Sequence, residues 1–182
     1  KLQYVEGIEL LDRHIPGWPS GDLNAGIKDA KILAAKYGLQ IYALGPHVHL
    51  YNTEPAKINK EVASCKQWID LCAENGIPAM RTQVGGVVGL FGFKSIPKAV
   101  KIVRNFLDQV LPYAEEKKVK IGLETHHQFS SHPVFLKQIS DIYRNSPALG
   151  IIYDWGNFKL NSARYKALEI ATEPHNHIYN HV

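Results

Sequence analysis

The chain has 182 residues, of which 45% are hydrophobic, and its 21 Lys and Arg side chains outnumber its 17 Asp and Glu side chains to give a net charge of +4. This composition supports one buried core and excludes a disordered chain. No apolar run reaches the roughly 20 residues that cross a bilayer, and no cluster of Lys and Arg with interleaved aromatic residues indicates a nucleic-acid surface. We therefore expect no membrane and no nucleic acid as a partner.

Short apolar segments with strand composition alternate with longer segments of helical periodicity along the chain. Strands are predicted at Gly7–Leu11, Leu39–Leu44, Ala79–Gln83, Lys120–Glu124, Gly150–Asp154 and His177–Val182. Helices are predicted at Asn24–Tyr37, from Pro55 to just before Gly76, and at Pro97–Glu116, Pro133–Asn145 and Ser162–Ala171. This regular alternation predicts parallel strands that are joined by right-handed crossovers.

Five residues define the predicted ends of the helices. Asp22, Thr53, Ser95 and Ser131 each precede a helical segment and have side chains that accept a hydrogen bond from a backbone amide of the first turn. Gly38 follows the first helix and can adopt the left-handed conformation that stops it.

Two cysteines, Cys65 and Cys72, lie seven positions apart in the second predicted helix. At a rise of 1.5 Å per residue their Cα atoms would be about 10 Å apart, whereas a disulfide needs less than about 7 Å. The sequence therefore predicts two free thiols, which favours a cytoplasmic location.

Every predicted strand ends in polar side chains, within its last residues or directly after them. They are Glu9 and Asp12, His47 and His49, Arg81 and Gln83, Glu124 and His126, Asp154 and Asn157, and finally His181. In a closed barrel these side chains converge on one rim, whereas in an open sheet most would lie too far apart to cooperate. No Gly-x-Gly-x-x-Gly or Walker motif follows the first strand, which also counts against a nucleotide-binding open sheet. The predicted fold is thus an α/β parallel (β/α) TIM barrel that is incomplete, with about six strands and five helices.

A complete barrel has eight strands and typically about 250 residues. We therefore expect residues 1–182 to form a single partial barrel domain that is truncated at both ends. An arc of six strands has two open edges, so a second copy of the chain or another partner chain is expected to cover them. The apolar, Gly-rich loop Val87–Lys94 is a candidate lid or partner-facing patch.

Glu124 and Asp154 are hard oxygen donors at the ends of two neighbouring strands. Two carboxylates with an imidazole nearby suit a divalent cation such as Mn²⁺ or Mg²⁺. The alternative is a pair of buried carboxylates that are satisfied by a neighbouring Lys or Arg, or by backbone amides. Two such acids with His-rich neighbours favour the metal site.

Three groups are candidates for contacting a substrate. His47 and His49 alternate along an extended segment, so only one of them can point into the site, and either can instead cap a loop. Arg81 can hold a hydroxyl or a phosphate, or it can pair with one of the two acids. His126, or its neighbour His127, can orient a substrate or act as a base near neutral pH.

Four segments, taken in order, resemble the xylose-isomerase-like barrel superfamily and, more narrowly, its sugar phosphate isomerase/epimerase branch. They are Gly-Ile-Glu-Leu from Gly7, Ile-Gly-Leu-Glu-Thr-His from Ile121, Tyr-Asp-Trp-Gly-Asn from Tyr153, and the closing Ile-Tyr-Asn-His-Val. The resemblance implies a divalent cation bound by Glu124 and Asp154, with Mn²⁺ preferred over Mg²⁺, Co²⁺ or Zn²⁺, and further ligands beyond Val182. It also implies substrate contacts from Asn157 and His181, although Asn157 stands where family members often carry a His.

The activity that this resemblance implies is isomerisation or epimerisation of a sugar, sugar phosphate or polyol. The cation would polarise a carbonyl while Glu124, as both ligand and base, and a second Glu beyond Val182 move a proton on the adjacent carbon. His126 is the further catalytic candidate that the residues themselves suggest. Three alternatives remain open. They are a lyase of the same barrel, such as a C-glycoside-cleaving subunit with His126 or His127 as its base, an endonuclease-IV-like nuclease with three zinc ions, and a non-catalytic barrel fragment.

Overall fold

The computed structural model describes residues 7–48, 50, 54–84, 95–126, 129–158 and 161–181. Its strands are β1 (Gly7–Leu11), β2 (Gln40–Gly45), β3 (Ala79–Gln83), β4 (Lys120–Glu124), β5 (Leu149–Asp154) and β6 (His177–His181). Its α-helices are α1 (Leu23–Lys36), α2 (Pro55–Glu74), α3 (Ile96–Lys117), α4 (Pro133–Ile142) and α5 (Asn161–Ala171). Two short 3-10 helices, η1 (Asp12–His14) and η2 (Trp155–Asn157), follow β1 and β5.

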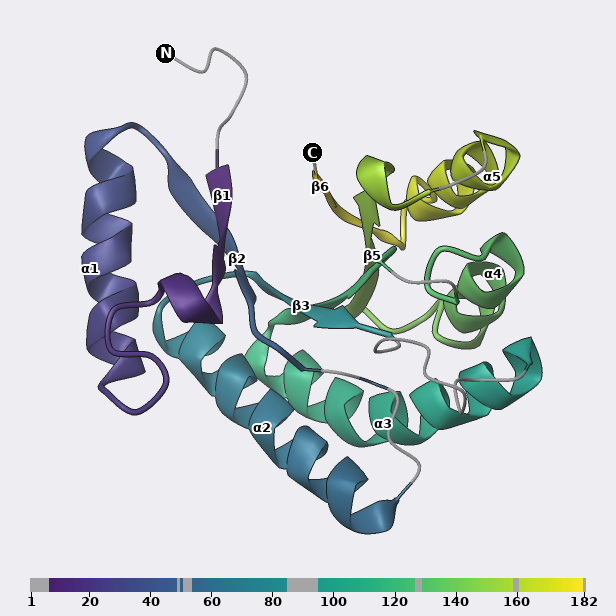
Figure 1. Ribbon diagram of the computed structural model, residues 1–182, viewed down its shortest axis with the longest axis horizontal. Helices are drawn as coiled ribbons and strands as arrows, with labels where there is room; N and C mark the ends of the chain where they lie inside the picture. The colour runs from purple at the N-terminus through teal and green to yellow at the C-terminus, as the bar shows by residue number, and fades with distance from the viewer. Residues whose placement is uncertain are drawn as a thin grey trace.

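The six strands form one parallel sheet whose order, β1-β2-β3-β4-β5-β6, is the order of the chain. The sheet is curved, and the helices lie on its outer side (Figure 1). A curved parallel sheet in sequential order, with a helix after each of the first five strands, is the arrangement of a TIM barrel. The predicted incomplete barrel of six strands and five helices is confirmed.

The core lies between the sheet and the helices, and strand alternation assigns each side chain to one face. Met80 of β3 is fully buried, and Cys65 of α2 places its Sγ 3.9 Å from the Met80 Sδ. Leu123 of β4 is buried in the same apolar core. The residues that follow them in sequence, Arg81 and Glu124, therefore point to the inner face of the sheet, away from the helices.

The predicted helix ends are confirmed at three places. Asp22 precedes α1, and its Oδ1 accepts a hydrogen bond of 3.0 Å from the Ala25 amide. Gly38 and Gly76, which follow α1 and α2, have φ angles of +71° and +63°. A side chain is disfavoured in this left-handed conformation, so glycine fits both positions.

The prediction that Ser131 caps α4 is wrong. His132 is the capping residue, and its side chain accepts a hydrogen bond from the Val134 amide. Ser95 does precede α3, but its side chain makes no capping hydrogen bond. Helix α4 also ends at Ile142 rather than Asn145, and the backbone of its C-cap residue, Tyr143, leaves the helical conformation at φ −109° and ψ 19°.

The two cysteines are free and buried, as predicted. Burial raises the pKa of the Cys72 thiol to about 12, so it remains protonated at neutral pH. None of the helices in the described part of the chain is both long enough and apolar enough to span a bilayer. Thr53 and the predicted lid Val87–Lys94 lie outside the described residues.

Candidate metal centre

Glu124 is the last residue of β4, and its side chain is 1% exposed. Its two carboxylate oxygens face different partners. Oε2 accepts hydrogen bonds from Arg81 and, at 3.0 Å, from Gln83 Nε2. Oε1 lies 3.1 Å from His126 Nδ1. One oxygen is thus held by β3, and the other is directed towards the chain that follows β4.

Asp154 ends β5, where the turn of η2 organises its carboxylate. Oδ1 accepts a hydrogen bond of 2.8 Å from the Gly156 amide, and Oδ2 accepts one of 2.7 Å from Asn157 Nδ2. The backbone of the same residue is tied to Thr125, since the Asp154 amide donates to the Thr125 hydroxyl at 2.8 Å. The two strand ends are therefore fixed relative to each other.

Glu124, His126 and Asp154 each direct one potential ligand atom to a common point, and these atoms lie within 4.8 Å of one another. Asn157 stands behind the cluster, with its Nδ2 3.2 Å from His126 Nδ1 and 2.7 Å from Asp154 Oδ2. An amide nitrogen carries two hydrogens, one for each of these acceptors. Nδ1 has a single lone pair in the plane of the ring, so a cation that binds Nδ1 would displace the Asn157 hydrogen bond from it.

Three acceptors that converge on one point suit a cation. Two carboxylate oxygens and one imidazole nitrogen are a donor set that Mn²⁺, Mg²⁺ or Zn²⁺ accepts. The side chains present at this site therefore fit the divalent cation that the sequence predicts. The cluster adds His126 to the two ligands, Glu124 and Asp154, that were predicted from the sequence.

A chain of buried charges runs from Glu124 across the inner face of the sheet. Arg81 donates from Nη1 to Glu124 Oε2 and from Nε to Glu9 Oε1, the latter at 2.5 Å. The side chains of Arg81 and Glu9 are 8% and 6% exposed. Glu124 thus combines the two alternatives that the sequence left open, because one oxygen is paired with an arginine and the other belongs to the cluster.

A second pair of charged side chains, Asp12 and His47, lies at the ends of β1 and β2. The His47 Nδ1 is 2.7 Å from Asp12 Oδ2, and the His47 amide donates to the same oxygen at 3.0 Å. Asp12 is buried, whereas the His47 side chain is half exposed. Burial tends to raise the pKa of Asp12, but hydrogen bonds from the side chain and amide of His47 and from the Arg13 amide outweigh it, so this pKa is lowered.

The lowered pKa of Asp12 predicts a pH-dependent contribution to stability. A carboxylate whose pKa is depressed by folding stabilises the fold above its unfolded-state pKa, near 3.8, and loses this effect as the pH falls through the folded-state value. We expect Asp12→Asn to lower the free energy of unfolding at pH 6, and the deficit to shrink below about pH 4. Urea denaturation at pH 6 and pH 3 measures it, with Asp29→Asn on the exposed side of α1 as the control for charge. A deficit of equal size at both pH values would contradict the prediction.

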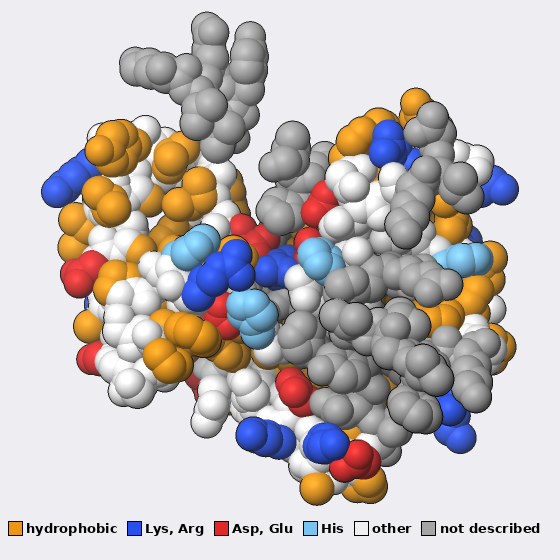
Figure 2. Space-filling view, viewed as in Figure 1, with side chains coloured by type: hydrophobic (Ala, Val, Ile, Leu, Met, Phe, Trp, Pro, Cys, Tyr) orange, Lys and Arg blue, Asp and Glu red, His pale blue; other side chains and the backbone are white. Residues whose placement is uncertain are grey.

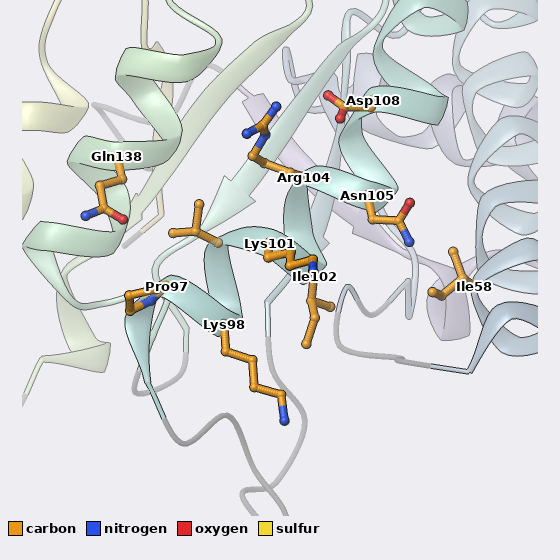
Figure 3. Close-up of a pocket in the computed structure, with 10 residues that line it drawn as sticks. Ile58, Pro97, Lys98, Lys101, Ile102, Arg104, Asn105, Asp108 and Gln138 are labelled. Atoms are coloured by element: carbon orange, nitrogen blue, oxygen red, sulfur yellow. The ribbon is translucent and has the colours of Figure 1, made fainter.

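Acidic, basic and His side chains gather in the middle of the face that is shown in Figure 2. A separate groove of about 940 Å³ lies on the helix layer and is lined by residues of α2, α3 and α4 (Figure 3). Lys98, Lys101 and Arg104 line this groove from α3. Such a row of basic residues along a helix is typical of a solvated face, and the cluster of acceptors at the strand ends remains the candidate site.

The structure brings together most of the residues that were predicted to form the site. Glu124, His126 and Asp154 converge, and Arg81 and Asn157 each bond to a member of the cluster. The backbone of His181 pairs with that of Asp154 in the β5–β6 ladder. His49 and His127 lie outside the described residues.

Sequence reasoning missed how Glu9, Gln83 and Asn157 connect to the cluster. Strand alternation places Gln83 on the same face of β3 as Arg81, but only the observed register shows that it lies opposite Glu124. Glu9 gave no comparable signal, because the register between β1 and β2 shifts at Ile8/Glu9.

Comparison with known proteins identifies relatives of this fold. A family model that is described as a xylose isomerase-like TIM barrel matches residues 5–180. No curated protein sequence matches the chain.

Several solved structures are similar to this chain at low sequence identity. A mannonate dehydratase from Streptococcus suis is 15% identical with a TM-score of 0.73, covering 97% of this chain and 64% of its own. A D-psicose 3-epimerase that was crystallised in the presence of D-fructose is 12% identical with a TM-score of 0.74, covering 97% and 62%. An IOLI protein with a bound zinc atom is 18% identical with a TM-score of 0.68, covering 90% and 58%. The chain thus spans less than two thirds of the length of these three proteins, and at such identity the similarity establishes the fold alone.

Proposed function

Because this chain belongs to the xylose isomerase-like TIM barrel family, we propose that it binds a divalent cation at Glu124, Asp154 and His126 and that the whole protein isomerises or epimerises a sugar. The observation that carries the proposal is the convergence of three ligand atoms within 4.8 Å at the ends of β4 and β5. In a parallel barrel the C-terminal ends of the strands are where catalytic groups are placed.

Each residue of the cluster has a role in the proposed reaction. A bound divalent cation would polarise a carbonyl oxygen of the substrate and stabilise the negative charge that develops on it. The Glu124 carboxylate takes the proton from the carbon next to that carbonyl and, in an isomerisation, delivers it to the former carbonyl carbon. His126, whose side chain is 34% exposed, offers Nε2 as a second group that moves a proton to or from a substrate oxygen.

Other side chains position these groups and the substrate. Asn157 holds Asp154 Oδ2 and His126 Nδ1 together, and its position at the cluster also suits a contact to a substrate hydroxyl. His181 and His49 remain predicted substrate contacts. The D-psicose 3-epimerase to which the fold is similar acts on a small sugar, and we propose a small sugar, sugar phosphate or polyol as the substrate class here. Mn²⁺ is the proposed cation, and a cytoplasmic location and a partner chain or second copy along the open edges remain predictions.

Exchange of the substrate hydrogen with solvent tests this function. We expect the complete protein, loaded with Mn²⁺ and incubated with ketohexoses in D₂O, to incorporate deuterium at the carbon next to the carbonyl. Proton NMR of the recovered sugar measures the incorporation. The His126→Asn variant should lose most of it, because that variant keeps a polar side chain but carries no titratable nitrogen.

The outcomes separate the proposed reaction from its alternatives. Loss of water or of another leaving group after deuterium incorporation would indicate a lyase of the same barrel. Absence of incorporation with every sugar tested, in protein that demonstrably holds the cation, would contradict the proposed isomerase. Chelator-treated protein serves as the control.

A further inference from the structure

We propose that Glu9 and Arg81 form an arm that positions Glu124 and sets the charge of the cation site, so that Glu9, three strands away from Glu124, controls cation affinity. We call these two side chains the Glu9–Arg81 arm. The inference rests on the proposed cation site at Glu124, Asp154 and His126, and it assigns positioning roles to two residues outside that site.

The arm spans four strands of the sheet. Glu9 belongs to β1, Arg81 to β3 and Glu124 to β4, so the arm passes over β2. Arg81 uses two different nitrogens, Nε for Glu9 Oε1 and Nη1 for Glu124 Oε2. The planar guanidinium fixes the angle between these two bonds, which a lysine cannot do. Glu124 therefore presents Oε2 to Arg81 and keeps Oε1 at the cluster.

The sheet leaves space for the arm at Gly45 of β2. A Cβ atom at this position would lie 2.0 Å from Glu9 Oε1, 2.7 Å from Leu11 Cδ2 and 3.0 Å from Arg81 Nη2. Gly45 is not among the residues with a positive φ, so its backbone conformation does not require glycine. Glycine fits here because the Glu9 carboxylate, the Leu11 side chain and the Arg81 guanidinium all lie where a Cβ atom would be.

The charges of the arm explain why Glu9 is needed. Arg81 paired with Glu124 alone would neutralise that carboxylate and compete with a cation for it. Glu9 supplies a second carboxylate to the Arg81 guanidinium, so the arm does not add a net positive charge beside Glu124 and Asp154. Burial tends to lower the pKa of Arg81, but the attraction of Glu9 and Glu124 raises it, so the guanidinium stays charged. Removing the Glu9 charge therefore lowers the negative charge available to a cation at Glu124 and Asp154.

Mn²⁺ affinity, measured by isothermal titration calorimetry at fixed pH and salt, tests the arm. We expect Glu9→Gln, which keeps a hydrogen-bond acceptor for Arg81, to weaken Mn²⁺ binding by about tenfold or more, because the interaction lies in a buried, weakly screened region. Gly45→Ala should weaken it by about 10- to 100-fold, the range for disturbing the partners of a metal ligand. This second variant changes no charge and displaces only the ends of side chains.

The controls separate positioning from stability and from overall charge. Glu116→Gln, on the exposed C-terminal turn of α3, changes the net charge equally and should leave the affinity within about twofold. A merely structural arm would lower the melting temperature of Glu9→Gln and Gly45→Ala while their Mn²⁺ affinities remain those of the wild type, and that result would overturn the inference. Gly45→Ala decides the question if Glu9→Gln does not fold. A wild-type protein that binds no Mn²⁺ would instead refute the proposed cation site, and the arm with it.

Discussion

Replacing Glu124 with Gln is expected to abolish cation binding while the fold persists. Gln keeps the shape of the side chain and an acceptor for the Arg81 and Gln83 hydrogen bonds, but it loses the negative charge that faces His126. Because Glu124 would be a direct ligand, the loss of Mn²⁺ affinity should exceed the 10- to 100-fold that is typical of outer partners. Turnover should fall by about 10²- to 10⁴-fold, the scale for losing a group that transfers a proton in the reaction.

Calorimetric titration with Mn²⁺ and the rate of deuterium exchange measure these two effects. Glu116→Gln is again the matched control, since it makes the same chemical change on an exposed helix. The melting temperature of metal-free Glu124→Gln should fall less than that of an Arg81→Met variant, because Arg81 keeps Glu9 as an ion-pair partner and the Gln oxygen as an acceptor. Undiminished metal binding and turnover in Glu124→Gln would remove the assignment of this residue as ligand and base.

Replacing Arg81 with Met is expected to destabilise the fold, in contrast to Glu124→Gln. The carboxylates of Glu9 and Glu124 are almost fully buried, and both would lose their ion pair with the Arg81 guanidinium. Removing one partner of a buried ion pair costs about 3–5 kcal/mol, because the remaining charge is desolvated without compensation. For a chain of this length that corresponds to a drop in melting temperature of about 10 °C.

Differential scanning calorimetry of the metal-free protein measures this loss. Arg144→Met, at an exposed position after α4, removes the same charge and should change the melting temperature by only a few degrees. Arg81→Lys tests the geometry, because a lysine keeps the charge but cannot bridge Glu9 and Glu124 with two fixed bonds. A melting temperature of Arg81→Met equal to that of Arg144→Met would show that the buried charges do not depend on Arg81.

The fold and the position of the site could be predicted from the sequence for a physical reason. Strands such as Lys120–Glu124 are short and apolar and end abruptly in a charged residue, and in a parallel barrel all such ends meet at one rim. The ends of α1 and α2 at Gly38 and Gly76 could be predicted from the sequence, because few residues other than glycine tolerate their positive φ angles.

The partners within the site could not be predicted, because they depend on how strands pair. A shift in register between Ile8 and Glu9 places Glu9 opposite Ala43, so that its side chain reaches Arg81 across β2. No local pattern in the sequence predicts that shift. Nor does the sequence show that Gly45 must lack a side chain to leave room for the Glu9 carboxylate. The capping of α4 by His132 in place of Ser131 was missed for a similar reason, since two adjacent side chains competed for one helix end.

The number of cations that the protein binds tests the central claim most directly. Titration of the metal-free wild type with Mn²⁺ is predicted to show one bound ion per chain. The Asp154→Asn variant removes the charge of the carboxylate at the end of β5, and it is predicted to abolish that binding. Three zinc ions per chain would favour the nuclease alternative. No bound ion, or binding that Asp154→Asn leaves intact, would contradict a cation centre shared by the ends of β4 and β5.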